Sequence, residues 1–425
     1  MGQVMASPKP AMHGGLTSGA VPLIEPYARI LRHPGAARFS AAAFVARLPI
    51  SMVGLGIVLL ISAVEGRYAA AGLVAAAYTL AAAFLNPLGS RLVDRWGQSR
   101  VVTFLVAVNV AMLLLLTMAV SASWPLAVLV ILGAVGGATQ PATGALVRAR
   151  WAAALGAHPS LRTAFAFESV LDEFIFIIGP PLATFIAVAI AAAAPLIMCA
   201  LLVGVGSLLL LVQRSSEPPS TPRGTSRGGS ILRSPGVLVV ITSFVAIGFV
   251  FGSIDVVTVA AADAEGRRAA AGIVLGIYAF GSMLSALVLG ARSQARADSS
   301  LPRQLLLATF ALALVTIPLV LVSGLVAIGA MVLLAGLTVS PVLLTGFTLI
   351  ERLVSPARLT EGLTWATSGI GLGVALSAAL SGWLVDQAGT RAGFVVTAVA
   401  ALVTLAVTAA GYPSLVRARG AARSV

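Results

Sequence analysis

Charged side chains are scarce in this 425-residue chain, and groups that perform covalent chemistry are scarcer still. Only 10% of the residues are charged and 59% are hydrophobic, whereas soluble domains carry about 25% charged residues. The single cysteine, Cys199, excludes an intrachain disulfide. The three histidines, His13, His33 and His158, lie in the N-terminal tail and in one loop, and the sequence shows no P-loop, metal-ligand cluster or nucleophile triad. We therefore expect no enzyme site, no metal site and no cofactor.

Acidic residues are few, since 14 Asp and Glu stand against 27 Lys and Arg, which gives a net charge of +13. A protein that reads nucleic acid gathers its basic residues on one soluble face. Here they are dispersed over short loops, so nucleic acid is not an expected partner. The first 37 residues are polar and broken by proline and glycine, and they lack the apolar segment of a signal peptide.

Long apolar runs are abundant. A helix of about 20 residues crosses the roughly 30 Å hydrocarbon core of a bilayer, and twelve runs of such length occur. They cover residues 39–64, 70–93, 101–121, 125–147, 163–190, 192–212, 236–261, 270–290, 304–323, 325–350, 359–385 and 393–411. We predict an all-α membrane protein of two six-helix bundles. Its parts are a tail (1–38), a bundle (39–213), a Pro-, Gly- and Ser-rich linker (214–235), a second bundle (236–411) and a basic tail (412–425).

The basic residues predict the orientation of these spans. With the N-terminus in the cytoplasm, the cytoplasmic loops hold most of the 27 basic residues, by about five to one, as the positive-inside rule requires. The basic residues that fall outside are Arg67, Arg267, Arg268 and Arg391, and Arg47 lies inside a span. Both termini are therefore predicted to be cytoplasmic. The same topology assigns Arg148 and Arg150 to a cytoplasmic loop, and Glu351, Arg352 and Glu361 to solvated edges of spans.

The two halves repeat at an offset of 200 residues. The segment EGRYAAAG at 65–72 recurs as EGRRAAAG at 265–272. At the same offset Tyr78 matches Tyr278, Ser90 matches Gly290, Gly136 matches Gly336 and Pro141 matches Pro341. These matches indicate one duplicated six-helix unit in parallel orientation.

A short charged turn, SRLVDRWGQSR at 90–100, joins the second and third spans. Its spacing Leu92-x-Asp94-Arg95-x-Gly97 resembles the GxLaDRxGRK loop between helices 2 and 3 of the major facilitator superfamily. Ser90 replaces the first glycine, and Arg100 stands one place later than the basic pair. The resemblance implies two bundles that rock about a central site.

The resemblance also implies that this turn gates the cytoplasmic side. The candidate gating residues are Ser90, Asp94, Arg95, Gly97 and Arg100. Asp94 is expected to contact the start of the eleventh span, near Arg358, Leu359 and Thr360, because a carboxylate is favourable at a helix N-terminus.

Three carboxylates, Glu168, Asp172 and Glu173, lie in the fifth span, where charge is costly and indicates function. Glu168 lies near the span's edge, and we favour the interpretation that it reaches the membrane interface. Asp172 and Glu173 lie at about the depth of Arg47 in the first span, roughly 12–14 Å from the cytoplasmic edge, so an ion pair is feasible. One arginine against two acids leaves one carboxyl unmatched, which suits a proton carrier. A pair that only holds the two helices together is equally consistent. All four residues are candidates for proton coupling.

By the same resemblance, spans 1, 4, 7 and 10 line the substrate cavity. The candidate substrate-binding residues are Thr139, Gln140, Thr143, Asp255, Thr338, Ser340 and Thr345. The hydroxyl residues surround Pro141 and Pro341, where irregular backbone is expected beside a cavity. Alternatively, the small hydroxyl residues pack helices together, and Asp255 lies at the interface. The triplet Gly179-Pro180-Pro181 resembles the core of a helix-5 signature of facilitator exporters.

The sequence thus predicts a drug-efflux-like secondary active transporter, a multi-pass protein of the bacterial cytoplasmic membrane. The predicted activity is proton-coupled antiport that exports an amphiphilic small molecule. The expected partners are that substrate, protons and membrane lipids, and we expect a monomer. Two alternatives remain: proton-coupled uptake of a polar metabolite, and a non-transporting membrane sensor or lipid scaffold.

Overall fold

The computed structural model describes residues 24–65, 68–156, 158–220, 231–267, 270–292 and 300–421. These residues are helical with short turns and include no β-strand. Twelve helical segments among them are long and apolar enough to cross a membrane, which confirms the predicted fold class. Residues 1–23, linker residues 221–230, residues 422–425 of the basic tail, and Arg67 and Arg268 lie outside the described part.

The first six spans form one bundle. They are α2 (Ala36–Arg47) continued by η1 (Leu48–Ser51) and α3 (Val53–Glu65), α4 (Tyr68–Trp96), α5 (Gln98–Ser121), α6 (Leu126–Ala138) continued by α7 (Thr143–Leu155), α8 (Ser160–Ala189) and α9 (Ala194–Leu211). The first and fourth spans are broken at Pro49 and Pro141, because proline lacks the N–H that a helix needs and clashes with the preceding turn. A short helix, α1 (Glu25–Leu31), precedes the first span.

The second bundle holds the other six spans. They are α10 (Pro235–Ala264), α11 (Ala270–Ala291), α12 (Leu301–Thr316) continued by η5 (Ile317–Val320), α13 (Leu325–Leu353) and the two halves of α14 (Leu359–Ala421). The halves of α14 meet at Gly389, whose φ of +80° is open to glycine and strained for other residues. The irregular backbone expected at Pro341 is absent, since α13 remains helical through it. Packing by neighbouring helices is the usual reason that a membrane helix tolerates a proline.

The packing of the two halves reflects the duplication. A Cβ atom added at Gly137 of α6 would overlap the carbonyl oxygen of Tyr78 on α4. A Cβ atom added at Gly336 of α13 would likewise overlap the carbonyl oxygen of Tyr278 on α11. In both bundles a glycine therefore lets the equivalent helices approach closely, which is how small residues act in membrane proteins.

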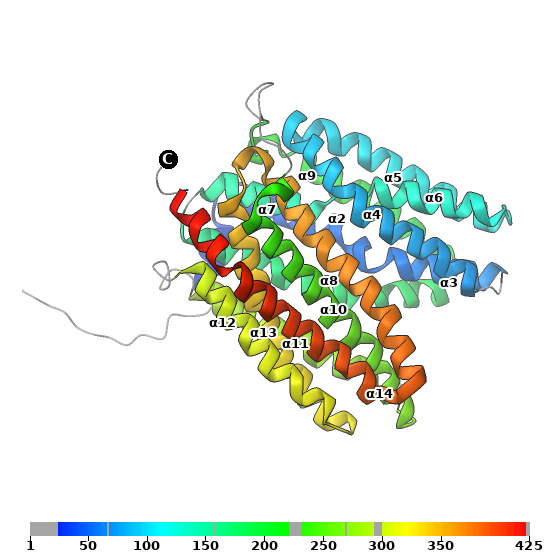
Figure 1. Cartoon of the computed structure of the whole chain (residues 1–425). Helices are drawn as coiled ribbons and strands as arrows, with labels where there is room; N and C mark the ends of the chain where they lie inside the picture. Colours follow the sequence, from blue (N-terminus) through cyan, green and yellow to red (C-terminus); the bar gives the residue numbers. More distant parts are fainter. Residues whose placement is uncertain are drawn as a thin grey trace, which may run out of the picture.

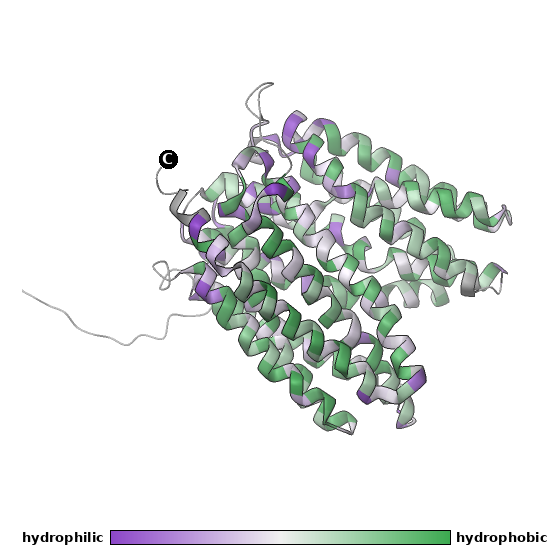
Figure 2. Cartoon of the chain, viewed as in Figure 1, coloured by the Kyte–Doolittle hydropathy of each residue, from purple (hydrophilic) through white to green (hydrophobic). Residues whose placement is uncertain are grey.

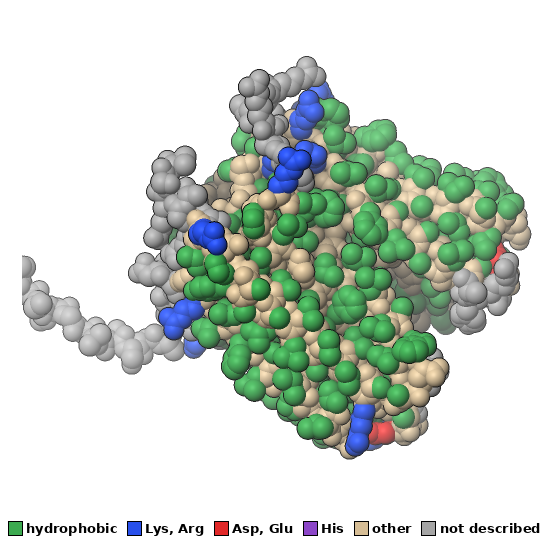
Figure 3. Space-filling model, in the orientation of Figure 1, with side chains coloured by type: hydrophobic (Ala, Val, Ile, Leu, Met, Phe, Trp, Pro, Cys, Tyr) green, Lys and Arg blue, Asp and Glu red, His purple; other side chains and the backbone are tan. Residues whose placement is uncertain are grey.

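The two bundles meet at one end and diverge toward the other (Figure 1). Hydrophilic residues gather at the end where the bundles meet, and Lys and Arg side chains are prominent there (Figures 2 and 3). We call this the basic end; it carries Arg95, Arg100 and Arg358. The opposite end carries Glu65 and Glu265. Figure 3 shows the surface hollowed between two lobes toward the opposite end, and large apolar side chains such as Val188 and Val326 are exposed on the outside.

Candidate functional site

A buried ion-pair network connects the first, fourth and fifth spans. Arg47 is the last residue of α2, where η1 interrupts the first span. Its guanidinium donates from one nitrogen to Asp172 Oδ1 (2.6 Å) and from the other to Glu168 Oε2 (2.5 Å). The Arg47 side chain is only 1% exposed. The ion pair predicted between the first and fifth spans is therefore present, and it involves Asp172.

Glu168 belongs to this network and does not reach the membrane interface. The residue is fully buried, and its carboxylate also accepts hydrogen bonds from Ser40 Oγ (2.6 Å) and Trp151 Nε1 (2.7 Å). The interpretation based on its distance from the span's edge was wrong, because α8 turns Glu168 toward the bundle interior. Donors from two other helices, Ser40 and Arg47 of α2 and Trp151 of α7, compensate the burial of its charge, as a buried carboxylate requires.

Arg148 is the second cation of the network. The sequence had predicted a loop position for this residue. The helix α7 continues to Leu155, so Arg148 and Arg150 lie on a buried helical segment. Arg148 donates to Asp172 Oδ2 over 2.8 Å. Two guanidinium groups therefore face two carboxylates, Glu168 and Asp172. The expected surplus of one acid over Arg47 does not exist inside this network.

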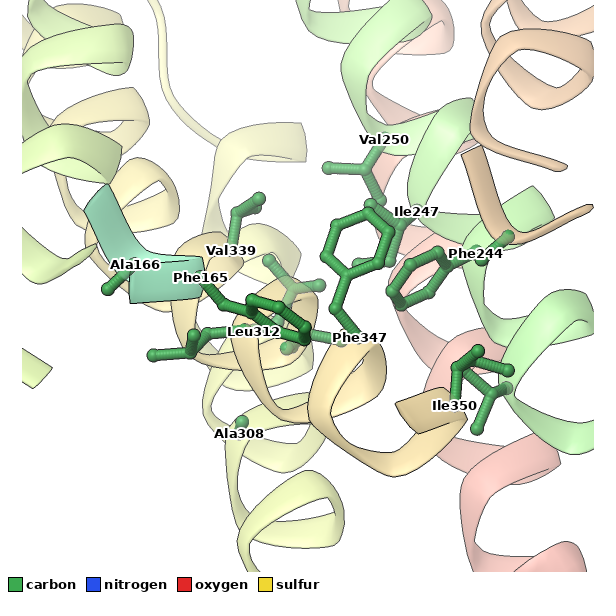
Figure 4. Packing of buried hydrophobic residues seen from close by; sticks show 14 of the residues in the cluster. Phe165, Ala166, Phe244, Ile247, Val250, Ala308, Leu312, Val339, Phe347 and Ile350 are labelled. Atoms are coloured by element: carbon green, nitrogen blue, oxygen red, sulfur yellow. The ribbon is translucent and has the colours of Figure 1, made fainter. Parts of the chain in front are cut away.

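The network also touches the second bundle. The Arg148 guanidinium carbon lies 4.5 Å from the centre of the Phe347 ring on α13, a cation–π distance. Phe347 packs edge-on against Phe244 of α10, with ring centres 5.0 Å apart. Figure 4 shows the Phe347 side chain between Phe244 of α10 and Phe165 of α8. The aromatic cluster thus joins the charged helices of the first bundle to the core of the second.

Glu173 follows Asp172 in sequence but binds a different partner. Its Oε1 accepts a hydrogen bond from Ser282 Oγ of α11 over 2.6 Å, and Ser282 shares a 3.0 Å hydrogen bond with Ser340 of α13. Among the described residues no basic side chain forms an ion pair with Glu173. This carboxyl therefore lies at the boundary between the bundles, outside the charge-balanced network.

The structure brings some of the proposed substrate residues near Glu173. Asp255 of α10 has an exposed side chain, yet its charge acts on both Glu173 and Tyr278. One turn earlier on α10, Phe251 packs against Tyr278 of α11; the choice between a substrate contact and an interfacial position for Asp255 stays a prediction. Ser340 reaches Glu173 through Ser282.

The other proposed substrate residues have different contacts. Thr139, Thr143 and Thr338 bond to carbonyl oxygens of their own segment. Thr345 accepts a 3.5 Å hydrogen bond from Arg162, and Gln140 is half-buried beside the Pro141 break. The structure gives none of these five a contact with the acids.

The gating loop contacts the second bundle at the expected place. The Asp94 carboxylate accepts hydrogen bonds from the backbone N–H groups of Thr360 (3.2 Å) and Glu361 (2.8 Å), in the first turn of α14. One turn earlier on α4, Ser90 shares a 2.7 Å hydrogen bond with Thr364. Glu361 is not a solvated edge residue as predicted: its side chain is 4% exposed and pairs with Arg358 at 2.7 Å. Its burial follows from the contact between the two bundles.

The remaining residues of the loop shape its turn. Gly97 has a φ of +88° and lets the chain turn from α4 into α5. Arg95 and Arg100 are exposed, and Arg95 lies 5.8 Å from the Trp96 ring centre.

The start of the linker is tied to this loop. Glu217 accepts a hydrogen bond from the backbone N–H of Ser99 (2.9 Å), and Arg150 donates to Ser216 Oγ (2.6 Å) and to Gln98 Oε1 (2.8 Å). Arg150 is therefore a buried structural contact between the fourth span, the loop and the linker.

A second contact, which the sequence analysis did not predict, closes the basic end on the other side of the interface. Thr163 of α8 donates to the carbonyl of Gly290 on α11 (2.7 Å), and the Tyr27 hydroxyl of α1 donates to the carbonyl of Leu287 (2.7 Å). Gly290 is the counterpart of Ser90, in a copy of the loop that has lost its aspartate. A Cβ atom there would overlap Tyr27 and Ala166. Burial raises the pKa of Tyr27 above its usual range, so its hydroxyl remains a donor at physiological pH.

Comparisons with known proteins agree with this architecture. A family model described as the Major Facilitator Superfamily matches residues 39–333 and 259–423. No curated protein matches the chain. Similar solved structures include a bacterial homologue of the iron transporter ferroportin in an outward-facing state (TM-score 0.69, 15% identity, 91% of this chain and 99% of that one). Another is the human organic anion transporter MFSD10 (TM-score 0.66, 15% identity, 88% of this chain and 100% of that one). At this identity they show the fold alone.

Because the family model covers nearly all of the twelve spans, this chain belongs to the Major Facilitator Superfamily and is a secondary transporter.

Proposed function

We propose that this transporter is a proton-coupled exporter of an amphiphilic small molecule in the bacterial cytoplasmic membrane. The basic end is placed in the cytoplasm, with both termini, because basic residues concentrate there and the positive-inside rule favours that orientation. In this orientation the described state is closed toward the cytoplasm by two contacts, Asp94 with the start of α14 and Thr163 with Gly290. The bundles diverge toward the outside (Figure 1).

One observation carries the proposal: Glu173 lies outside the balanced ion-pair network. Protonation of Glu168 or Asp172 would leave the two buried guanidinium groups with a single carboxylate between them, which is strongly unfavourable. Glu173 has a serine as its partner, so it can gain or lose a proton while both arginines stay compensated. Glu173 is therefore the proton carrier in this proposal, and Arg47, Arg148, Glu168 and Asp172 hold the helix that presents it.

The position of Glu173 links protonation to movement of the bundles. Its hydrogen bond to Ser282 crosses from α8 to α11, so rocking of the bundles must break or replace that bond. The neighbouring charges of Asp172 and Asp255 also act on Glu173, one from its own helix and one from the other bundle. A proton taken up from the outside can then be released to the cytoplasm after the bundles change their relative orientation.

The direction of transport is supported by a resemblance and by local packing. Gly179-Pro180-Pro181 resembles a signature of facilitator exporters, and Gly179 lies directly against Ser51 of η1 at the break in the first span. The solved neighbours are named for iron and for organic anions, so likeness in fold selects no substrate.

Transport into proteoliposomes with an imposed pH gradient tests the proposal. A proton antiporter accumulates its substrate when the lumen is acidic, whichever way the protein is inserted, whereas a proton symporter does so when the lumen is alkaline. We would use ethidium, chloramphenicol and taurocholate as amphiphiles and lactose as a polar solute, with protein-free liposomes as the blank. Accumulation of an amphiphile in acidic liposomes, lost in Glu173→Gln, supports proton-coupled export.

Two other results would contradict it. Accumulation of lactose with an alkaline lumen would favour the uptake alternative. Gradient-driven accumulation that survives in Glu173→Gln would place the proton carrier elsewhere.

A further inference from the structure

We propose that Glu173, Asp255 and Tyr278 form a binding site for an organic monocation at the boundary between the bundles. This inference rests on the proposed transport function and adds the charge and chemical class of the substrate. The three residues come from α8, α10 and α11, so the site is assembled from both bundles.

The two acids give this region an unbalanced negative charge. Glu173 binds Ser282, one turn after Tyr278 on α11, and Phe251, one turn before Asp255 on α10, packs against the Tyr278 ring, so all three groups lie in one neighbourhood. In the described part of the chain neither acid forms an ion pair, although Glu168 and Asp172 nearby each do. A region between helices that carries two acids without cations favours a positively charged occupant.

The Tyr278 hydroxyl is a second, independent sign of a ligand. Tyr278 is only 5% exposed, and its hydroxyl has no hydrogen-bond partner among the described residues. Buried polar groups are nearly always paired, because an unpaired one costs stability. A ligand or its water shell would supply the missing partner.

The duplicated half shows that the unpaired hydroxyl is particular to this location. The counterpart, Tyr78, accepts a hydrogen bond from Asn109 Nδ2 (3.4 Å). The residue at the position equivalent to Asn109 is Thr309, whose hydroxyl donates to the carbonyl of Leu306 on its own helix (3.0 Å). The first bundle therefore provides a partner for its tyrosine, and the described part of the second bundle does not.

Aromatic rings and hydroxyl groups favour an organic cation over a small inorganic one. The Phe251 ring packs edge-on against Tyr278, with ring centres 5.9 Å apart, and aromatic faces attract organic cations. Inorganic cations need several oxygen ligands to replace their hydration shell, and the described residues contain no group of three or more Asp, Glu, His or Cys side chains suited to a metal ion.

The site is accessible from the opposite end of the molecule. Asp255 lies nine residues before the end of α10 at Ala264, on the half of the helix toward that end, and its side chain is exposed. The basic end is closed by the two contacts described above. Asp255 therefore lies on the half of α10 toward the end at which the bundles diverge (Figure 1).

Equilibrium binding of two matched ions tests the inference. Tetraphenylphosphonium and tetraphenylborate have nearly the same size and shape but opposite charge. With the full-length protein in nanodiscs, after subtraction of empty nanodiscs, we expect tetraphenylphosphonium to bind at least tenfold more tightly than tetraphenylborate. Asp255→Asn and Glu173→Gln should each weaken tetraphenylphosphonium binding at least tenfold, and Tyr278→Phe several-fold. The matched control Tyr78→Phe should leave it unchanged.

Equal binding of the two ions by the wild-type protein would overturn the inference without any variant. Unchanged affinity in folded Asp255→Asn and Glu173→Gln would also overturn it. Displacement of the probe by millimolar Na⁺, with K⁺ as the control, would indicate an inorganic cation site and would overturn it as well. The assay uses no gradient, so its result is separate from that of proton coupling. Binding without gradient-driven transport would refute the proposed function and leave the cation site standing.

Discussion

Replacement of Asp94 by asparagine should shift the equilibrium between the two orientations of the bundles. Asp94 accepts two backbone hydrogen bonds at the start of α14, from Thr360 and Glu361. Asparagine keeps one acceptor oxygen, so Asp94→Asn loses one of these bonds and the negative charge that faces the positive end of the helix. Both losses weaken only the state that is closed at the basic end.

The size of the shift follows from the contacts. A hydrogen bond to a charged group contributes about 1.5–3 kcal/mol, and a charge at a helix terminus about 0.3–1 kcal/mol. The amide oxygen of asparagine still accepts one of the two backbone hydrogen bonds, so the net loss of free energy in the closed state is about 2 kcal/mol. Since each 1.4 kcal/mol is a factor of ten, the closed population should fall about 30-fold relative to the open one.

Double electron–electron resonance on paired spin labels measures this ratio. Ser121 ends α5 and Leu321 follows η5, and both are exposed at the opposite end of different bundles. In a background without Cys199, labels there should show more of the short distance in Asp94→Asn. The control is Arg91→Ala, which removes a long ion pair of 3.8 Å between the exposed Arg91 side chain and Glu361 and should shift the ratio little. An Asp94→Asn distribution equal to wild type would refute the reasoning.

Four other substitutions test the packing and the network. Glu168→Gln leaves the two buried arginines with one carboxylate between them, and breaking a buried ion pair costs about 3–5 kcal/mol, so the melting temperature in detergent should fall sharply. Asp172→Asn should cost less, because the Asp172 side chain is 33% exposed. Tyr27→Phe removes a hydrogen bond of about 1 kcal/mol and should shift the spin-label ratio about fivefold in the same direction as the loop variant. Gly336→Ala forces a methyl group onto a neighbouring carbonyl and should reduce the yield of folded protein, whereas Gly276→Ala, which meets open space, should not.

Each of these expectations has a contrary result. Equal melting temperatures for Glu168→Gln and wild type would mean that the arginine finds another partner. A larger loss in Asp172→Asn would reverse the proposed importance of the two acids. An unchanged spin-label ratio in Tyr27→Phe would remove α1 from the closure of the basic end. Normal yield of Gly336→Ala would show that α11 and α13 can separate.

The sequence predicted the features that repeat or follow a known spacing. The twelve spans follow from apolar run length, and the contact of Asp94 with the start of α14 follows from the loop motif. The duplication matched Tyr78 with Tyr278, and in both halves a glycine of the facing helix lies against that tyrosine's carbonyl oxygen, although Gly137 takes this place in the first half and Gly336, the counterpart of Gly136, in the second. These features depend on local sequence, so one chain was enough to identify them.

The sequence did not predict which way buried charges face. Arg148 lies just beyond an apolar run and was assigned to a loop, but α7 continues past it and turns it inward. Glu168 was placed by its depth alone, whereas its partners come from other spans. Tyr27 lies in a polar tail, where a single aromatic residue does not indicate a contact with the second bundle. Rotation about a helix axis and pairing between distant spans are tertiary properties, which hydropathy does not record.

The central claim is that Glu173 carries the exchangeable proton while the ion-pair network stays ionised. Infrared difference spectra of the full-length protein at acidic minus alkaline pH test it directly, because a protonated carboxyl has its own C=O stretching band. One such band from the membrane interior should be lost in Glu173→Gln and retained in Asp172→Asn. A band that persists in Glu173→Gln and disappears in Asp172→Asn would show that Asp172, and not Glu173, carries the proton.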